Sequence, residues 1–278
     1  MPFTISHAAL VPPFSRFLAR WRLLSAVVIG TMVPDFALFL PWRMPRIETH
    51  SILGLYTFCL PVGLVSYWIF QYLIKKPVLE VLPDGAYARW RAYSSPADWA
   101  SVVQWLLAGF GVLAGAVTHL VWDAFTHEGA RGVRMIPWLD EPVVDIGIHH
   151  MVGVRLLQDG SSLIGLAVVV LWICYGLRRG HDTPVADRLL SKVERRVWFL
   201  IYALGAIASS AAWFVLTRWG DGTLHTAHSV TALAGGIAVA ALRGLATAFL
   251  FTSLALDGRL GALQARRAPK PPKAGRPD

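Results

Sequence analysis

The chain has 278 residues, of which 55% are hydrophobic and 15% charged, and its mean hydropathy is +0.51. A soluble domain of this length carries more charge, so the composition excludes an ordinary soluble enzyme and indicates an integral membrane protein. The net charge of +9 is spread over loops and the C-terminal segment, so we expect no nucleic acid partner. Cys59 and Cys174 lie inside apolar runs, where neither a disulfide nor a thiolate metal site is expected.

The N-terminal part reads as a half-buried or re-entrant helical segment. Residues 1–10 lack the basic start and small-residue cleavage site of a signal peptide, so we expect them in the mature protein. An apolar run over 23–40 is interrupted by Pro34, which breaks a helix. Asp35 follows it, and a carboxylate in such a run is costly. It is either a functional acid or a turn residue that caps the next helix.

Apolar runs that are long enough to cross a bilayer follow at 51–74, 99–122, 161–177, 197–216 and 230–256. We therefore predict an all-α fold, a polytopic membrane helix bundle of about five full spans plus the N-terminal segment. Residues 1–257 are assigned to the membrane-embedded domain. The proline-rich, basic residues 258–278 are predicted to form a disordered tail.

Lysine and arginine are distributed unevenly between the two sets of loops. The loops 75–98 and 178–196 and the segment after Leu256 hold sixteen of them. The opposite connections, which are 41–50, 127–160 and 217–229, hold six. The positive-inside rule then predicts that the first set and the C-terminal tail are cytoplasmic. The connection 127–160 would face outward, as a plain ectodomain or as the cover of a site.

The end of the second apolar run carries three potential ligands on one helix face. His119, Asp123 and His127 stand at i, i+4 and i+8. Neighbours in this trio are about 6 Å apart along the axis and can share an ion, whereas the two histidines are about 12 Å apart. The spacing favours two ions with Asp123 between them. On its own, the trio fits equally well with histidines that cap the helix end.

Most histidines fall in two windows, 1–50 and 119–150, and the predicted topology brings both windows to the same membrane face. The candidate ligands there are His7, Asp35, His50, His119, Asp123, His127, His149 and His150. Imidazole and carboxylate together suit Zn²⁺, and without thiolates Mn²⁺ or Fe also fits. Such ions activate water and clamp phosphoesters, so hydrolysis is the natural chemistry. His181, His225 and His228 are interpreted as incidental or surface residues.

Four short motifs carry a resemblance: M-P-F-T-I-S-H-A-A at 1–9, M-V-P-D-F at 32–36, E-T-H-S-I-L-G at 48–54 and T-H-L-V-W-D-A-F-T-H-E-G at 118–129. They are similar to the bacterial membrane family called domain of unknown function 4184, over most of the chain up to about Leu256. That family more distantly resembles membrane-bound metal-dependent hydrolases and the zinc-dependent phospholipase C and single-strand nuclease group. The resemblance implies a phospholipase C-type helical core in a bacterial cytoplasmic membrane.

The same resemblance implies a ligand set. Asp35, His50 and His119 would share one zinc ion, and Asp123 would bridge to a second. His127 and a later ligand would complete the second ion, and His7 would add to a further one.

The later part of the chain departs from the soluble enzymes. Their late histidine is followed by an acid four residues on, whereas His149 and His150 are followed at that distance by Gly153 and Val154. Asp159 stands where a histidine is expected in this family. It therefore competes with His149 and His150 for the role of late ligand.

We therefore expect a membrane-bound metal-dependent hydrolase that acts on a phosphoester such as a lipid headgroup, with Asp35 and Asp123 as its catalytic acids. Arg243, inside the last span, would meet an anionic headgroup, form a salt bridge or snorkel to an interface. The alternative is a non-enzymatic transporter or assembly factor with a structural metal or a proton relay. No inverted repeat is visible, which counts against a transporter.

Overall fold

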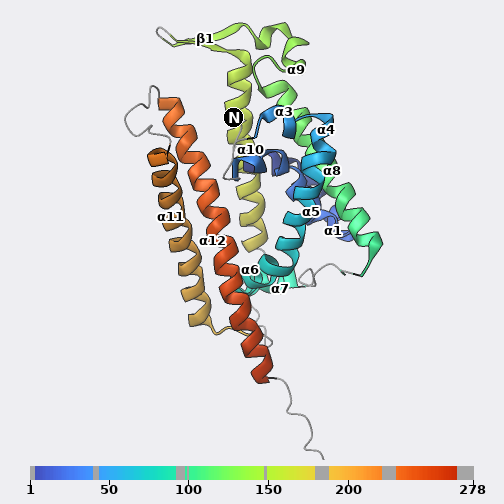
Figure 1. Cartoon of the computed structure of the whole chain (residues 1–278), viewed down its shortest axis with the longest axis vertical. Coiled ribbons are helices and arrows are strands. Elements are labelled where there is room, and N and C mark those ends of the chain that lie inside the picture. Colours follow the sequence, from blue (N-terminus) through green and yellow to red (C-terminus); the bar gives the residue numbers. More distant parts are fainter. Residues whose placement is uncertain are drawn as a thin grey trace, which may run out of the picture.

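The computed structural model describes residues 4–39, 44–91, 98, 100–146, 149–178, 188–220 and 230–267. Side chains are not described at 144–146, 149–150, 178, 217–220, 230–235 and 267. The fold is a bundle of helices with a short hairpin at one end (Figure 1). The predicted all-helical bundle is thus confirmed, whereas the hairpin was not predicted.

Within the described residues, five helical segments are long and apolar enough to cross a membrane: Ile52–Val81, Val102–Thr126, Gly153–Leu177, Lys192–Leu216 and Gly236–Arg266. These segments match the predicted spans in number and order. Each is an apolar run that forms a helix long enough to cross the bilayer. The protein is therefore a multi-pass membrane protein. Long apolar side chains such as Phe199, Leu204 and Ile207 are exposed on the fourth segment, as expected for a surface in contact with lipid.

The first span is a composite of α and π turns. It consists of α4 (Ile52–Gly54), a π turn η4 (Leu55–Cys59), α5 (Leu60–Ile69), a second π turn η5 (Phe70–Ile74) and α6 (Lys75–Val81). The first π turn ends directly before α5, whose second residue is Pro61. Proline has no N–H for the helical ladder, and a wider turn accommodates this loss.

The other spans lie in single helices, which are α8 (Val102–Thr126), α10 (Gly153–Arg178), α11 (Lys192–Gly220) and α12 (Val230–Arg267). Two of them extend beyond their predicted limits. α10 begins at Gly153, inside the predicted connection 127–160, and α12 continues to Arg267, past the predicted domain boundary after residue 257. Residues 268–278 of the predicted tail lie outside the described residues.

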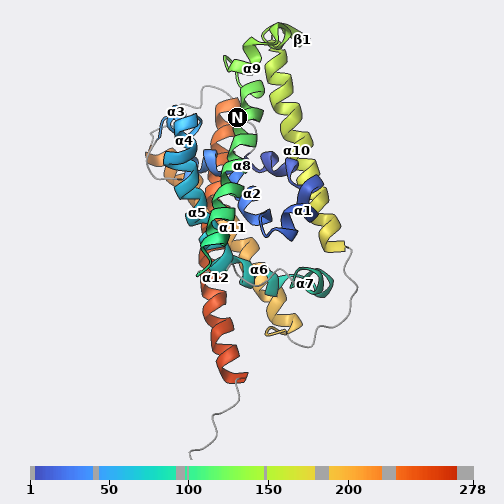
Figure 2. The same cartoon turned by 90° about the vertical axis from the view of Figure 1, so that its right-hand side faces the viewer.

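The N-terminal segment is broken into short helices, as predicted for a half-buried segment. They are the 3-10 helices η1 (Thr4–Leu10), η2 (Pro12–Phe14) and η3 (Val33–Phe39), with α1 (Ser15–Arg20) and α2 (Leu24–Gly30) between them. Among them, η1 packs on α10 and α2 packs on α8, near the middle of the bundle, whereas η3 contacts α8 and α12 (Figures 1 and 2). The segment therefore delivers polar side chains into the interior without crossing the bundle.

The remaining short elements lie at the two ends of the molecule (Figure 1). They are α3 (Arg46–Thr49), α9 (Arg131–Arg134), the 3-10 helix η7 (Pro137–Leu139) and the strands β1 (Pro142–Ile146) and β2 (His149–Val152) near one end, and α7 (Asp84–Trp90) near the other. The strands are antiparallel, with Asp145 opposite His150 and an irregularity between Pro142 and Val144.

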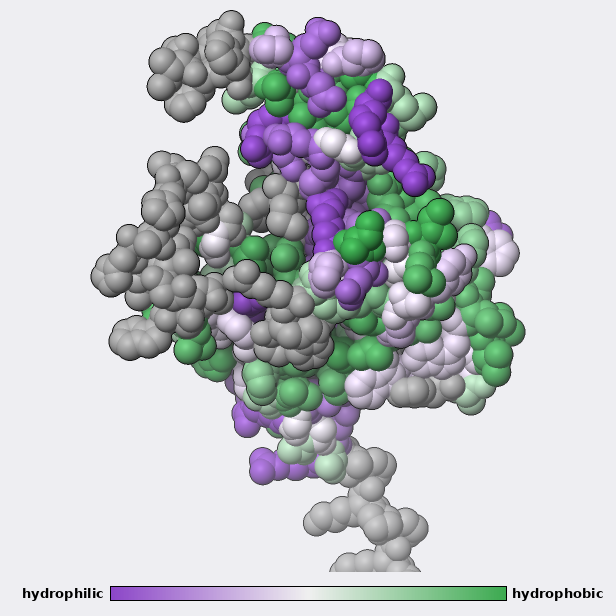
Figure 3. Space-filling view, turned by 45° about the horizontal axis from the view of Figure 1, so that its top comes forward, coloured by the Kyte–Doolittle hydropathy of each residue, from purple (hydrophilic) through white to green (hydrophobic). Residues whose placement is uncertain are grey.

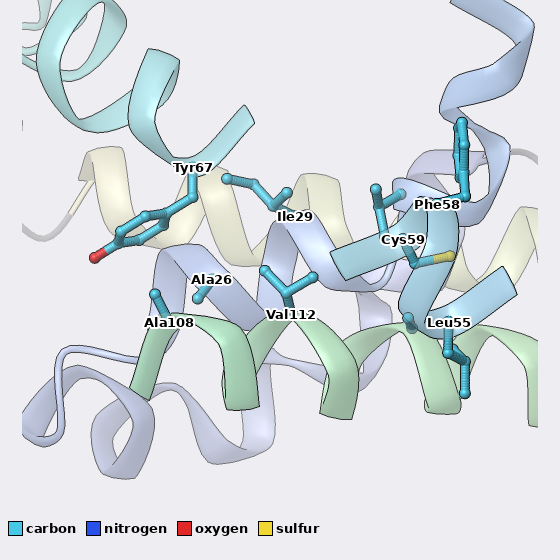
Figure 4. Close-up of a cluster of buried hydrophobic side chains, with 10 residues drawn as sticks. Ala26, Ile29, Leu55, Phe58, Cys59, Tyr67, Ala108 and Val112 are labelled. Carbon is cyan, nitrogen blue, oxygen red and sulfur yellow. The ribbon is translucent and has the colours of Figure 1, made fainter. Parts of the chain in front are cut away.

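Helices α2 and α8 cross at backbone contact. A Cβ atom on Gly115 would lie 2.4 Å from the carbonyl oxygen of Val27 and 2.6 Å from the amide nitrogen of Thr31. One on Gly30 would lie 2.3 Å from the carbonyl oxygen of Val112. Small residues at such a crossing let helices approach closely inside a membrane. Buried apolar side chains of α2, α5 and α8 pack beside this crossing (Figure 4).

The end of the molecule opposite the hairpin carries the basic loops. Arg188 donates to the carbonyl oxygens of Glu80 and Leu82, at the C-terminus of α6, and to Asp84 Oδ1 at 2.7 Å. Arg195, at the start of α11, also pairs with Asp84. The described residues Asp84, Arg188 and Arg195, from the two basic stretches 75–98 and 178–196, therefore meet at the end that the positive-inside rule assigns to the cytoplasm.

Candidate metal centre

A cluster of histidine and aspartate side chains lies where the last turns of α8 meet three N-terminal segments. η1 provides His7, η3 provides Asp35, and His50 directly follows α3. The last turns of α8 provide His119 and Asp123. Four of these side chains are buried, with exposures of 1% for His7, 5% for Asp35, 1% for His119 and 6% for Asp123. Buried acids and imidazoles in this number need a common partner.

Four ligand atoms are linked by short distances in a ring of four contacts. His50 Nε2 lies 3.3 Å from Asp35 Oδ1 and 3.5 Å from Asp123 Oδ2. His119 Nε2 lies 3.3 Å from Asp123 Oδ2 and 3.8 Å from Asp35 Oδ1. Ligand atoms around a tetrahedral zinc ion at about 2.05 Å are about 3.3 Å apart. The four contacts are close to this value, and the ligand atoms of Asp35, His50 and His119 all lie within 4.8 Å of one another, so these three side chains could hold one ion.

The second oxygen of Asp123 faces a different pair of histidines. Asp123 Oδ1 lies 3.6 Å from His7 Nε2 and 3.5 Å from His127 Nδ1. The rings of His7 and His119 stack with their centroids 3.8 Å apart. A carboxylate with ring nitrogens beside both of its oxygens can bridge two ions, and the ligand atoms of His7, His119 and Asp123 lie close enough to one another to hold one of them.

Neighbouring polar groups fix how the ligand side chains are oriented. His119 Nδ1 lies 2.8 Å from the carbonyl oxygen of Thr31. A carbonyl oxygen only accepts, so Nδ1 carries the hydrogen, and in the neutral ring Nε2 is left with its lone pair. His50 Nδ1 similarly lies 2.7 Å from Thr49 Oγ1, and Asp35 Oδ2 accepts a hydrogen bond of 2.8 Å from Thr4. Such partners are typical of metal-binding histidines and carboxylates.

The close crossing of α2 and α8 produces the contact with Thr31. Because Gly115 has no side chain, the backbone of α2 can pack directly against α8 at this position. His119 lies one turn further along α8. The carbonyl group of Thr31, just after the C-terminus of α2, therefore reaches the imidazole. The packing of small residues and the orientation of this ligand are consequences of the same helix contact.

Seven buried polar atoms of the cluster have no hydrogen-bond partner: both ring nitrogens of His7 and of His127, Nε2 of His50, Nε2 of His119 and Oδ1 of Asp123. A buried polar atom without a partner costs about 1–3 kcal/mol. Several such atoms at one place are unusual in a native protein. Most of them are lone-pair donors, so a cation is the partner that fits them.

The protonation states also suit a cation. Burial and the neighbouring His119 lower the pKa of His7 to about 4, and burial lowers the pKa of His127. Burial acts to raise the pKa of Asp35, but the neighbouring rings of His50 and His119 and a hydrogen bond from Thr4 bring that pKa below its usual value. At neutral pH, His7 and His127 are therefore neutral and Asp35 is ionised, which are the forms that bind metal.

Arg46 is a member of the cluster that the sequence analysis counted only as a basic loop residue. Its Nη2 contacts Asp123 Oδ2, the oxygen that also faces His50 and His119. Arg46 and His50 stand at i and i+4 across the short helix α3. That spacing is the one signal that could have linked Arg46 to the site.

Other predicted site residues lie apart or remain undescribed. Asp159 is exposed on α10 and is not among the residues that the structure brings together here. His149 and His150 lie in β2, but their side chains are outside the described set, so the late ligand stays a prediction. The residues interpreted as incidental, His181, His225 and His228, also fall outside the described residues.

Arg243, inside α12, contacts two neighbouring helical segments. Its Nε donates to the carbonyl oxygen of Leu38 in η3, and its guanidinium lies 5.1 Å from the centre of the Trp213 ring. A cation over an aromatic face is stabilised without a carboxylate partner. Arg243 therefore connects α12 and α11 to the helix that carries Asp35.

The fold and the cluster together define a class: a multi-pass membrane protein with a buried histidine and aspartate centre, built from a broken N-terminal segment and the end of one span. The chain belongs to the family described as Domain of unknown function (DUF4184), which matches residues 1–254. The predicted family is thereby confirmed. No curated protein and no solved structure matches the chain.

Proposed function

We propose that the protein is a membrane-bound metal-dependent hydrolase whose substrate is a phosphoester at the outer face of a bacterial cytoplasmic membrane. The observation that carries the proposal is the spacing of 3.3–3.8 Å between the ligand atoms of Asp35, His50, His119 and Asp123. A divalent ion such as Zn²⁺ held there would supply a Lewis acid and lower the pKa of water that it binds.

The chain's own residues divide into two roles. A shell closed by four protein ligands is typical of structural ions, whereas a catalytic site leaves one position open. The longest of the four contacts is the 3.8 Å between His119 Nε2 and Asp35 Oδ1. We therefore assign His50, His119 and Asp123 to holding the ion, and Asp35 Oδ1 to orienting the attacking water and accepting its proton.

Asp35 is prepared for this role. Its Oδ2 is occupied by the hydroxyl group of Thr4, which leaves Oδ1 directed toward the ligands. Its lowered pKa keeps it ionised at neutral pH. The second group around Asp123 Oδ1, formed by His7 and His127, is assigned to a second ion that would balance the charge of a phosphoryl group.

The position of the centre supports a substrate at the membrane surface. The ligands of α8 lie in the last two turns of a membrane-spanning helix, next to the end that carries α9 and the hairpin. Hydrophilic residues form a band that runs from this end down the face seen in Figure 3, with hydrophobic residues beside it. A phospholipid fits such a face, because its phosphoester headgroup would contact the hydrophilic residues and its acyl chains the hydrophobic ones.

The test is hydrolysis of bis(p-nitrophenyl) phosphate, p-nitrophenyl phosphate and phospholipid vesicles by protein purified in detergent. We expect turnover that chelation abolishes and Zn²⁺ restores. Asp35→Asn should retain the metal and lose turnover by about 100-fold or more, the range of general-base effects. Asp159→Asn, a matched change at an exposed acid, should leave both unchanged.

Two results would overturn the proposal. Metal-loaded protein without turnover on any of these substrates would favour a structural ion. Loss of the ion in Asp35→Asn would show a closed shell of four protein ligands and would remove the open position that hydrolysis needs.

A further inference from the structure

The side chain of Arg46 reaches from the surface to the centre of the cluster. It is 39% exposed, whereas Asp123, with which it pairs, is 7% exposed. The oxygen that it contacts is Asp123 Oδ2, which also lies 3.5 Å from His50 Nε2 and 3.3 Å from His119 Nε2. The guanidinium group therefore stands beside the position that fits an ion.

We propose that Arg46 binds the phosphoryl oxyanion of the ligand when metal is present, and that in the metal-free protein the same guanidinium blocks the site by pairing with Asp123. This inference rests on the proposed function, because it needs a metal at the cluster. It adds the group that recognises the anion.

Arg46 and an ion would compete for Asp123 Oδ2. Both are positively charged, and if both contacted this oxygen they would lie close together in a buried site, where the repulsion between them is weakly screened. An ion held by His50, His119 and Asp123 therefore displaces the guanidinium from this oxygen. Conversely, the pairing of Arg46 with Asp123 weakens the binding of the ion.

The displaced side chain stays beside the site. The carbonyl oxygen of Arg46 accepts hydrogen bonds from the backbone N–H of His50 at 2.8 Å and from Thr49 Oγ1 at 3.3 Å. His50 is itself assigned to the ion, so the backbone of Arg46 is fixed to a ligand. Only the long side chain can move, and it ends next to the open position.

The chemistry of the guanidinium selects the ligand class. Its planar set of N–H donors matches two oxygens of a phosphoryl group, and it stays charged at any physiological pH. A phosphoryl oxyanion would bind both the metal and Arg46.

The experiment measures the binding of inorganic phosphate to Zn²⁺-loaded protein by calorimetry in detergent. We compare the wild type, Arg46→Gln, Arg46→Lys and the control Arg134→Gln, which changes an exposed arginine of α9 at the same end. Arg46→Gln should bind phosphate at least about tenfold more weakly, Arg46→Lys should lie between, and Arg134→Gln should match the wild type.

The affinity for Zn²⁺ itself is the second readout. Arg46→Gln should bind Zn²⁺ several-fold more tightly than the wild type when phosphate is absent, because the competing cation is gone. In the wild type, phosphate should tighten Zn²⁺ binding and Zn²⁺ should tighten phosphate binding by the same factor. This linkage needs no variant, so it tests the proposal even if Arg46→Gln fails to fold.

Unchanged phosphate affinity in Arg46→Gln, weaker Zn²⁺ binding in that variant, or no linkage in the wild type would each overturn the inference.

Nanodiscs with phosphatidic acid distinguish the source of the anion: a stronger Arg46-dependent interaction than with phosphate identifies a lipid headgroup, and a weaker one identifies a soluble phosphate compound. Arg46-dependent phosphate binding without turnover would leave the inference standing and reject the hydrolase. Turnover with an unchanged KM in Arg46→Gln would leave the hydrolase standing and reject the role of Arg46 in binding the anion.

Discussion

At the residue scale, the sequence identified most of the cluster because few residue types bind metal. His7, Asp35, His50, His119 and Asp123 were all candidates, and the structure brings them together. Arg46 was not a candidate, because an arginine in a loop is interpreted as a membrane anchor unless its partner is known. His7 lies near Asp123 Oδ1, whereas His50 and His119 lie near Asp123 Oδ2. The spacing of residues along the chain does not predict which oxygen each ring approaches.

The protonation of His7 gives a prediction for pH. Its pKa falls from 6.5 in the unfolded chain to about 4 in the fold. Between these values the unfolded chain binds a proton that the folded protein does not, so acidification favours unfolding. The melting temperature of chelator-treated protein should therefore fall as the pH is lowered from about 7 to 5.

His7→Gln is the control, since it removes this proton uptake and should reduce the slope of melting temperature against pH. An unchanged slope in the variant, or a melting temperature that rises on acidification, would contradict a buried neutral His7.

The partner of His50 gives a second prediction at this scale. Thr49→Val removes the hydroxyl group that lies 2.7 Å from His50 Nδ1 and keeps the volume of the side chain. Loss of such a supporting hydrogen bond weakens metal binding by about 10–100-fold. Thr57→Val, at an exposed threonine that bonds only its own helix, should leave the affinity for Zn²⁺ unchanged in a competition titration. Equal affinities in the two variants would refute the supporting role of Thr49.

At the scale of elements, hydropathy predicted the spans, because a bilayer demands long apolar helices. It did not predict how the N-terminal segment divides into 3-10 and α turns, or the strands around 142–152. Those depend on contacts between distant parts of the chain, such as η1 with α10, where a Cβ on Gly165 would lie 2.8 Å from Ser6. The crossing of α2 and α8 is of the same kind.

Gly115 therefore links helix packing to the metal centre. Gly115→Ala places a methyl group 2.4 Å from the carbonyl oxygen of Val27, so α2 must move away and carry the Thr31 carbonyl from His119. Overpacking of this kind costs about 1–3 kcal/mol. We expect a lower melting temperature and weaker Zn²⁺ binding.

Gly109→Ala is the matched change in the same helix, where the nearest atom, a methyl carbon of Leu60, is an ordinary 3.5 Å from the new Cβ. It should keep the metal and leave the melting temperature equal or higher, since alanine favours a helix by about 0.5–1 kcal/mol over glycine. The account of this helix contact fails if the two alanine variants behave alike.

At the scale of the whole molecule, the sequence predicted that ligands from separate segments would converge at one membrane face. The structure supports the convergence: the cluster lies toward the end with α9 and the hairpin, and the basic loops meet at the other end. The extended limits of α10 and α12 were missed, because polar residues past the apolar run gave no signal that the helices continue.

The orientation predicts which end reacts with an impermeant thiol reagent. In a background without Cys59 and Cys174, Asp140→Cys should be labelled by a membrane-impermeant maleimide in intact cells. Lys192→Cys, exposed at the start of α11, should be labelled only after lysis. The reverse pattern would place the centre on the cytoplasmic side.

The most direct test of the account is elemental analysis of the detergent-purified wild type beside Asp123→Asn, each after incubation with Zn²⁺ and gel filtration. Both oxygens of Asp123 lie within 3.6 Å of histidine ring nitrogens of the cluster, so we expect zinc bound to the wild type and most of it lost from the variant. A wild type without metal, or a variant that retains as much as the wild type, would contradict a metal centre at this cluster.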